Sequence, residues 1–199
     1  MSHRSRLEEL FDSHAELVRV VRSSVLDSIE KCGAVLVETL ANGGTVFIAG
    51  NGGSAADAQH FAAELVGRFF IKTRRALPGI ALTVDTSALT AISNDFGYQN
   101  LFARQLEGLA RAGDAFVGIT TSGRSPNILA AMEVAHRMGL SCIGLVGNDA
   151  SAVAPYCAQV VSIPHGETAR VQEMHITTIH GWCDMIDRHF GNASESQKE

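Results

Sequence analysis

Two residues of this chain, His60 and Glu64, have the types and the spacing that chemistry requires. Four residues along an α-helix leave an offset of about 40°, so both side chains share one face if this segment is helical. An imidazole and a carboxylate on one face can bind a metal ion or exchange a proton with a substrate. In isolation such a pair is more often a solvent-exposed ion pair, so its surroundings must decide.

A strand, a tight turn and a helix must position this pair. Residues 45–49 form a short apolar run of strand-forming types, and Gly-Asn-Gly-Gly at 50–53 leaves no room for regular structure. Ser54 is predicted to be the N-cap of the alanine-rich helix that carries His60 and Glu64. Glycines let a ligand approach the backbone, and the unpaired N–H groups that begin a helix favour an anion or a polar sugar. We therefore expect a ligand-binding loop here.

A second strand, at residues 115–120, runs into a loop of hydroxyl residues, and Pro126 then fits the first position of a helix over 127–138. Backbone N–H groups, the helix dipole and hydroxyls together suit a phosphate monoester, although an ordinary capped helix uses the same residue types. Because open α/β sheets bind ligands at the carboxyl ends of their strands, both loops can face one crevice. The ligand class that we infer is a sugar phosphate. The hydroxyl residues are Thr120, Thr121, Ser122 and Ser125.

The rest of the chain alternates between helical and strand patterns. Apolar residues at three- and four-residue steps predict one long helix from Leu7 to Ile29, before a second helix at 34–41. The alternation indicates a parallel sheet that is covered on both faces. Residues 168–190 form a last helix with apolar residues on more than one side, which suits an oligomer, and 191–199 form a polar tail. The further strands are predicted at 79–84, 141–146 and 159–163, and Asp85 begins a helix.

The composition narrows the class of protein. At 199 residues and 46% hydrophobic content, the chain suits one α/β domain with a sizeable core. A net charge of −5, with scattered Lys and Arg, argues against a nucleic-acid partner. No apolar stretch approaches the roughly 18 residues that a membrane-spanning helix needs, and no apolar signal segment is present. Four cysteines without a CxxC pair fit a reduced setting, so we expect a cytoplasmic protein with no membrane partner.

Four segments carry a more specific signal. They read GNGGSAADAQHFAAEL, ISNDFGYQNLFARQ, ITTSGRSPNIL and RVQEMHITTIH. In this order and spacing, over residues 36–190, the chain resembles the phosphoheptose isomerases of the sugar isomerase (SIS) domain family. The resemblance implies a flavodoxin-like three-layer α/β sandwich with a parallel five-stranded sheet, formed as a single SIS domain by residues 1–190. It also implies extra N-terminal helices at 5–41 that pack in the oligomer.

The function that this resemblance implies is an aldose–ketose isomerase. Such an enzyme converts sedoheptulose 7-phosphate to D-glycero-D-manno-heptose 7-phosphate through an enediol, the first step toward the ADP- or GDP-heptose precursors of lipopolysaccharide or other surface glycans. The family pattern implies a homotetramer with sites at subunit interfaces and one Zn2+ per subunit. It places zinc on His60, Glu64, Gln172 and His180, with Glu64 as the catalytic base and His180 as the acid. It places substrate contacts on Asn51, Gly52, Gly53, Glu64, Asn94, Asp95, Thr120, Thr121, Ser122, Ser125 and Gln172.

The residue types suit this chemistry. Moving a proton between adjacent carbons needs a base over C1 and C2 and an acid to manage the oxygens, and zinc can polarise a carbonyl. Glutamine is an unusual zinc ligand, so other divalent ions can substitute. Gln172 and His180 are eight residues apart, about 80° around a helix. Both reach one ion only if the helix bends, if the length of the glutamine compensates, or if different subunits contribute.

Several neighbouring residues have simpler interpretations. Arg68 continues the stripe of His60 and Glu64 and either forms an ion pair with Glu64 or reaches the substrate; the ion pair is favoured. Asp57, one turn before His60, either orients that imidazole or complements the helix dipole. Ala169 stands where some relatives carry an acidic residue. The remaining histidines are interpreted as structural or solvent-facing; they are His3, His14, His136, His165, His175 and His189.

A non-catalytic function is the alternative. A relative of this family associates with the replication initiator protein and uses the same fold as a tetrameric scaffold. That relative lacks the acidic residue and the imidazole at the positions that match Glu64 and His180. Because this chain has both groups, the sequence favours the isomerase.

Overall fold

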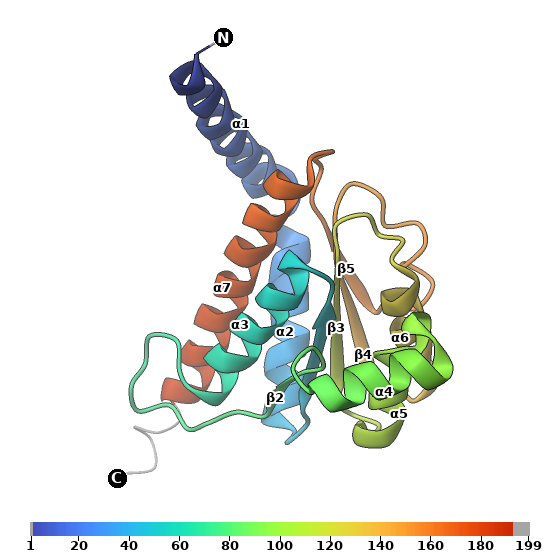
Figure 1. Cartoon of the computed structure of the whole chain (residues 1–199). Helices are drawn as coiled ribbons and strands as arrows, with labels where there is room; N and C mark the ends of the chain where they lie inside the picture. The colour runs from blue at the N-terminus through green and yellow to red at the C-terminus, as the bar shows by residue number, and fades with distance from the viewer. Residues whose placement is uncertain (1, 193–199) are drawn as a thin grey trace.

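Five parallel strands form one sheet in this protein, whose computed structural model describes residues 2–192 (Figure 1). The strand order is β2-β1-β3-β4-β5, and every neighbouring pair is parallel. This is the flavodoxin-like order, so the predicted fold class is confirmed. The strands are β1 (Val46–Gly50), β2 (Gly79–Ala81), β3 (Ala115–Thr120), β4 (Ser141–Val146) and β5 (Gln159–Ser162).

Helices cover both faces of the sheet (Figure 1). Alternate residues of β1 enter different cores: Val46 and Ile48 pack beneath one helical layer, and Phe47 and Ala49 beneath the other. Because successive side chains of a strand point to opposite faces, the sheet has two apolar faces. The first layer holds α2 (Leu26–Ala41), α3 (Gly53–Val66) and α7 (Thr168–Asn192). The second holds α5 (Ala103–Leu109) and α6 (Pro126–Arg137), with α4 (Thr86–Phe96) and the short η1 (Tyr98–Asn100) beside them.

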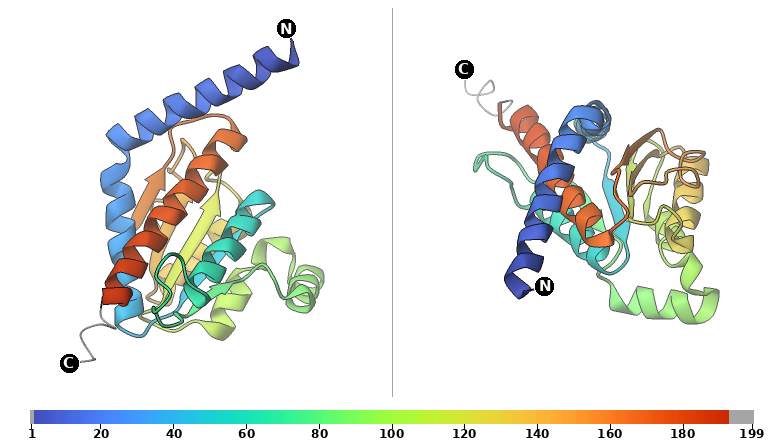
Figure 2. Two further views of the ribbon diagram at one scale, coloured as in Figure 1. Left: turned by 90° about the vertical axis from the view of Figure 1, so that its left-hand side faces the viewer. Right: turned by 90° about the horizontal axis from the view of Figure 1, so that it is seen from above.

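The N-terminal helix differs from the prediction. A single helix to Ile29 was expected, but the chain forms α1 (His3–Ser24) and then α2, with a break at Val25. The hydroxyls of Ser23 and Ser24 both donate to the carbonyl of Val20, at 3.0 and 2.8 Å. Serine hydroxyls that bond back to a helix carbonyl favour a bend, which explains the break. Helix α1 then leaves the body of the molecule at an angle (Figure 2).

Two other boundaries also shift. Strand β2 ends at Ala81 instead of residue 84, because the chain turns there toward Asp85, whose carboxylate caps α4 by accepting from the N–H of Ala88. Helix α7 continues to Asn192, so the first two residues of the predicted tail are helical. The remaining tail residues, 193–199, lie outside the described residues. Within the described residues, no helix has the length and apolar content that a membrane crossing requires.

Helices α3 and α7 run side by side in the same direction. Residue 53 at the start of α3 lies against Gln172, and further along Phe61 packs on Trp182 with ring centroids 6.0 Å apart. Just beyond α3, the backbone N–H groups of Phe70 and Ile71 reach Asp187. Because residues later in α3 contact residues later in α7, the two helices are parallel. Residues that lie opposite each other on α3 and α7 can therefore form one site.

His175 fastens the middle of α7 to the sheet. It is fully buried, and its Nε2 lies 3.1 Å from the carbonyl oxygen of Val146, the last residue of β4. Because a carbonyl only accepts, Nε2 carries the proton. Burial lowers the pKa of His175 to about 4, against 6.5 for an unperturbed histidine. The folded state therefore binds this proton less readily than the unfolded state does.

The first prediction concerns this histidine. The stability that its neutral form contributes is fully present above the unfolded pKa and is lost as pH falls from 6.5 through about 4. We expect the loss to reach up to about 3 kcal/mol in wild type, and to be smaller in His175→Gln, which keeps a donor for Val146. Urea unfolding at a series of pH values measures the free energy of unfolding of both proteins. Equal pH dependence in the two proteins would contradict this account.

Candidate active site

His60, Glu64 and His180 come together between α3 and α7. The Nε2 of His60 lies 3.2 Å from Oε1 of Glu64 and 3.2 Å from Nε2 of His180. Ligand atoms around a tetrahedral zinc ion are roughly 3.3 Å apart, given metal–ligand distances near 2.0–2.1 Å. The side chain of His60 is 43% exposed and that of Glu64 24%, so the cluster is open to a ligand. The parallel packing of two helices thus joins residues 120 positions apart.

The cluster is not a closed metal cage. Both 3.2 Å contacts centre on His60, and within the described residues no group of three or more His, Cys, Asp or Glu side chains could hold a metal ion as it stands. The donor set of two imidazoles and one carboxylate is nevertheless the set that zinc prefers. Zinc at these residues stays a prediction.

Helix α3 begins two residues earlier than expected, at the glycine loop. Gly52 is the N-cap, with φ +56°, and α3 starts at Gly53. The predicted N-cap Ser54 is instead a buried helical residue, and its N–H donates to the carbonyl of Asn51 at 3.0 Å. The N-cap prediction was wrong because only a glycine readily adopts the left-handed turn at position 52, and that turn starts the helix.

Gln172 lies at this loop. A Cβ added to Gly53 would be 2.6 Å from the amide nitrogen of Gln172, so the absence of a side chain at 53 lets the amide rest on the backbone. His60 and Glu64 lie seven and eleven residues further along α3, about 10 and 16 Å at 1.5 Å per residue. One chain therefore presents two parts of a site: the loop with Gln172, and the cluster of His60, Glu64 and His180.

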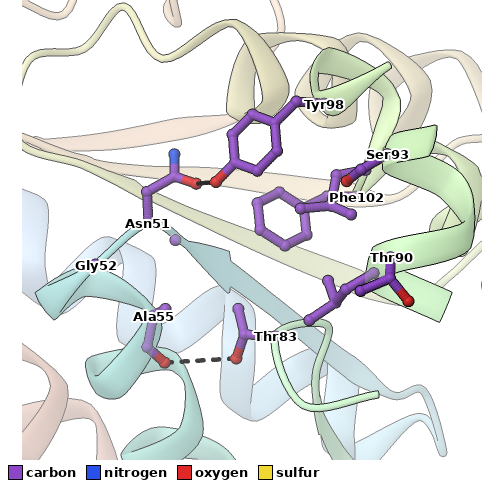
Figure 3. Close-up of a pocket in the computed structure, with 11 residues that line it drawn as sticks. Asn51, Gly52, Ala55, Thr83, Thr90, Ser93, Tyr98 and Phe102 are labelled. Carbon is purple, nitrogen blue, oxygen red and sulfur yellow. Dashed lines mark hydrogen bonds between the residues drawn. The ribbon is translucent and has the colours of Figure 1, made fainter. Parts of the chain in front are cut away.

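A reciprocal amide pair holds the first loop to the start of α6. Asn51 and Asn127 exchange hydrogen bonds of 2.9 and 2.8 Å. The hydroxyl of Tyr98 donates to Oδ1 of Asn51 at 2.9 Å, as Figure 3 shows. Asn127 is buried. A buried amide with no partner would be costly, so this pairing fixes the spacing of the two loops. Sequence reasoning missed Asn127 and Tyr98, because nothing local distinguishes a polar residue that pairs across the fold.

A cavity of about 410 Å³ opens beside this pair (Figure 3). Its walls come from the end of β1, the start of α3, and the α4–η1 segment, with hydroxyls of Thr83, Thr90 and Ser93 among apolar side chains. The predicted sugar contacts Asn94 and Asp95 are not among its lining residues. They are exposed, and Asn94 donates to Asp95 at 2.8 Å. Asn51 and Gly52 are therefore brought to this cavity, and Asn94 and Asp95 are not.

The hydroxyl loop converges at the carboxyl end of β3. The Oγ1 of buried Thr120 lies 2.9 Å from Oγ of Ser125 and 3.4 Å from Oγ of Ser122. Ser125 is the N-cap of α6 but makes no side-chain capping bond, so its hydroxyl serves the loop instead. Arg124, the one cation in this loop, forms an ion pair with Asp149. Hydroxyls gathered at a helix N-terminus provide the donors that a phosphate requires.

The prediction that Arg68 pairs with Glu64 was wrong. Within the described residues, Arg68 forms no ion pair with Glu64; α3 has ended at Val66, so the helical stripe does not continue to position 68. The Arg68 guanidinium instead contacts the carbonyl of Phe69 at 3.4 Å.

Asp57 does not complement the dipole of α3, which was one of its two predicted roles. The first turn of α3 contains no acidic residue, because the helix begins before Ser54. The Oδ2 of Asp57 is buried with no hydrogen-bond partner among the described residues. Burial raises the pKa of this carboxyl, and nearby His60 opposes that shift.

Comparisons with known proteins agree with the fold and identify the family. Residues 9–147 match the SIS domain family. The phosphoheptose isomerase of Aliarcobacter butzleri is 48% identical over 92% of this chain and 97% of its own length. Among solved structures, the phosphoheptose isomerases of Neisseria gonorrhoeae and Francisella tularensis superpose with TM-scores of 0.88 and 0.90, at 39% and 34% identity, each over 94% of this chain and all of the other. The chain belongs to the phosphoheptose isomerases of the SIS domain family.

Proposed function

We propose that this protein converts sedoheptulose 7-phosphate to D-glycero-D-manno-heptose 7-phosphate. The observation that carries the proposal is the meeting of a carboxylate, Glu64, and an imidazole, His180, on either side of His60. A hydroxyl loop at a helix N-terminus and a cavity with hydroxyls in its wall, at the same sheet edge, add a place for the phosphate and the sugar. The relatives that bear the name phosphoheptose isomerase support the same activity.

In the mechanism, Glu64 is the base. It takes a proton from C1 of the open-chain ketose while His180 donates a proton to the oxygen on C2, which gives the cis-enediol. The hydroxyl on C1 then returns its proton to His180, and Glu64 delivers its proton to C2, which gives the aldose. Each group ends in the state in which it began. The hydroxyls of the loop from Thr120 to Ser125 hold the phosphate, so the reacting carbons stay fixed during both transfers.

Zinc is the metal that these residues fit. His60, Glu64 and His180 would hold it through two imidazole nitrogens and one carboxylate oxygen, and the last two residues each lie 3.2 Å from His60. A bound zinc ion supplies positive charge that polarises the carbonyl and stabilises negative charge on oxygen. Other divalent ions with similar ligand preferences could replace it.

We further propose that two copies of the chain form each site in a homotetramer. Within one chain, Gln172 and the glycine loop lie about three helical turns from Glu64, so a second copy would bring Gln172 to the cluster. Of the alternatives open from sequence, this arrangement requires no bend of α7. The exposed apolar side chains of α1, among them Leu7 and Phe11, offer surface for such an assembly. We place the enzyme in the cytoplasm, where its sugar-phosphate substrate would be made.

The non-catalytic scaffold is not favoured. A scaffold has no need of a carboxylate and two imidazoles in contact at a partly exposed position, and the relatives reported above carry an enzyme's name.

Replacement of the base tests the mechanism. Glu64→Gln keeps the shape and the hydrogen-bonding capacity of the side chain but cannot accept the C1 proton, so turnover of sedoheptulose 7-phosphate should fall by at least about 10³-fold. Glu133→Gln, on the exposed surface of α6, is the matched control and should keep wild-type activity. Product is followed by NMR. A Glu64→Gln protein that retains more than a tenth of the activity would contradict the assignment.

Removal of the metal tests the cofactor. A protein dialysed against a chelator should lose activity and regain it with one equivalent of zinc per subunit, and His60→Ala should bind zinc at least about tenfold more weakly. Metal content by mass spectrometry and zinc affinity by calorimetry provide readouts apart from activity. Full activity in protein shown to contain no divalent metal would refute a catalytic role for zinc.

Mixing of two inactive variants tests the shared site. Glu64→Gln and Gln172→Ala proteins, each inactive alone, are unfolded together and refolded as mixed oligomers. If each site takes Glu64 from one chain and Gln172 from another, random mixing should restore about a quarter of wild-type activity. If one chain supplies both residues, no intact site can form and the mixture stays inactive.

A further inference from the structure

A buried ion pair links the two helices that carry the proposed acid and base. Arg74 lies in the segment between α3 and β2, and Asp187 lies on α7, two turns beyond His180. Nε of Arg74 donates to Oδ1 of Asp187 at 2.5 Å, and the two side chains are 1% and 2% exposed. Among the ion pairs of the described residues, this is the one in which both side chains are almost fully buried.

Arg74 holds the backbone of Glu64 itself. Its terminal nitrogens donate to the carbonyl of Glu64 at 2.6 Å and to the carbonyl of Leu65 at 3.0 Å. Both carbonyls lie in the last turn of α3, where the helix offers no N–H partners of its own. The guanidinium therefore caps α3 at the residue whose side chain is the proposed base.

Asp187 holds the segment that contacts His180. Its Oδ2 accepts hydrogen bonds from the N–H groups of Phe70 and Ile71, at 2.6 and 2.7 Å. The preceding residue, Phe69, packs on the ring of His180 with centroids 5.4 Å apart. The carboxylate thus fixes the backbone beside the proposed acid.

This carboxylate is charged at neutral pH. Burial alone would raise the pKa of Asp187, but the hydrogen bonds from the Ile71 N–H, Arg74 and the Phe70 N–H together lower it below the usual range. These three hydrogen-bond donors therefore stabilise the negative charge of Asp187.

We infer that Arg74 and Asp187 are positioning residues that set the separation between the Glu64 carboxylate and the His180 imidazole. Arg74 binds the last turn of α3, which carries Glu64. Asp187 fixes the segment that begins after Phe69, whose ring packs on His180. Stability alone is a weak reason for such a pair, because a buried ion pair contributes little more than well-packed apolar residues of the same volume. Apolar residues, however, could not hold these four backbone groups by directed hydrogen bonds. This inference rests on the proposed function, in which both groups act on adjacent carbons.

Kinetics of Asp187→Asn and Arg74→Lys test the inference. Each change keeps the volume but removes a charge or the forked geometry, so kcat should fall by about 10- to 100-fold while KM for sedoheptulose 7-phosphate changes less than about threefold. Asp187→Glu, which keeps the charge, should recover part of kcat. The matched control is Leu106→Ala, which opens a cavity in the core on the other face of the sheet and should lower stability without lowering kcat at a temperature where the protein is folded.

A second readout does not depend on activity. In a crystal structure of Asp187→Asn, the 3.2 Å contact between His60 and His180 should lengthen or break, and in Leu106→Ala it should be unchanged. If Asp187→Asn does not fold, Asp187→Glu takes its place in this comparison. An unchanged contact, an unchanged kcat, or an effect confined to KM would overturn the inference. A wild-type protein that does not turn over the heptose phosphate would instead refute the proposed function, and the contact would still decide the positioning role.

Discussion

The packing of α3 against α7, in the same direction on one face of the sheet, is the constraint on which the rest of the structure depends. It joins His60 and Glu64 to His180 across 120 residues of sequence. Apolar contacts such as Phe61 with Trp182 hold the helices together. These contacts have no direction, however, and would tolerate a slide of one helix along the other. Polar contacts at the two ends of the interface remove that freedom.

The two ends do this in different ways. At the carboxyl edge of the sheet, the bare backbone of Gly53 admits the amide of Gln172. At the opposite end, Arg74 and Asp187 tie the last turn of α3 to α7. The proposed acid and base lie between these two anchors. The loops at the sheet edge are fixed separately, by the amide pair of Asn51 and Asn127. Substrate binding and proton transfer therefore depend on different sets of contacts.

Local patterns allowed much of this to be predicted from the sequence. The bounds of β3 and β4 and the two ligand loops follow from apolar runs, glycines and hydroxyls within a few neighbouring residues. The break at Val25 and the N-cap at Gly52 did not follow, because each depends on which of several local hydrogen bonds forms. The pairs Asn51–Asn127 and Arg74–Asp187 join residues 76 and 113 positions apart, and one sequence offers no signal for them. The resemblance supplied the ligand set of His60, Glu64, Gln172 and His180, and the fold explains why three of them meet within one chain while Gln172 lies apart.

The central claim is that one substrate spans the hydroxyl loop and the helix pair. A crystal structure of the Glu64→Gln protein with sedoheptulose 7-phosphate tests it most directly, because this variant binds the sugar without consuming it. We predict the phosphate at Thr120, Ser122 and Ser125, and carbons C1 and C2 within about 3.5 Å of residue 64 and His180. The loop should come from one copy of the chain and the helix pair from another. A sugar whose phosphate occupies the loop while C1 and C2 lie away from both helices of every copy would contradict the account.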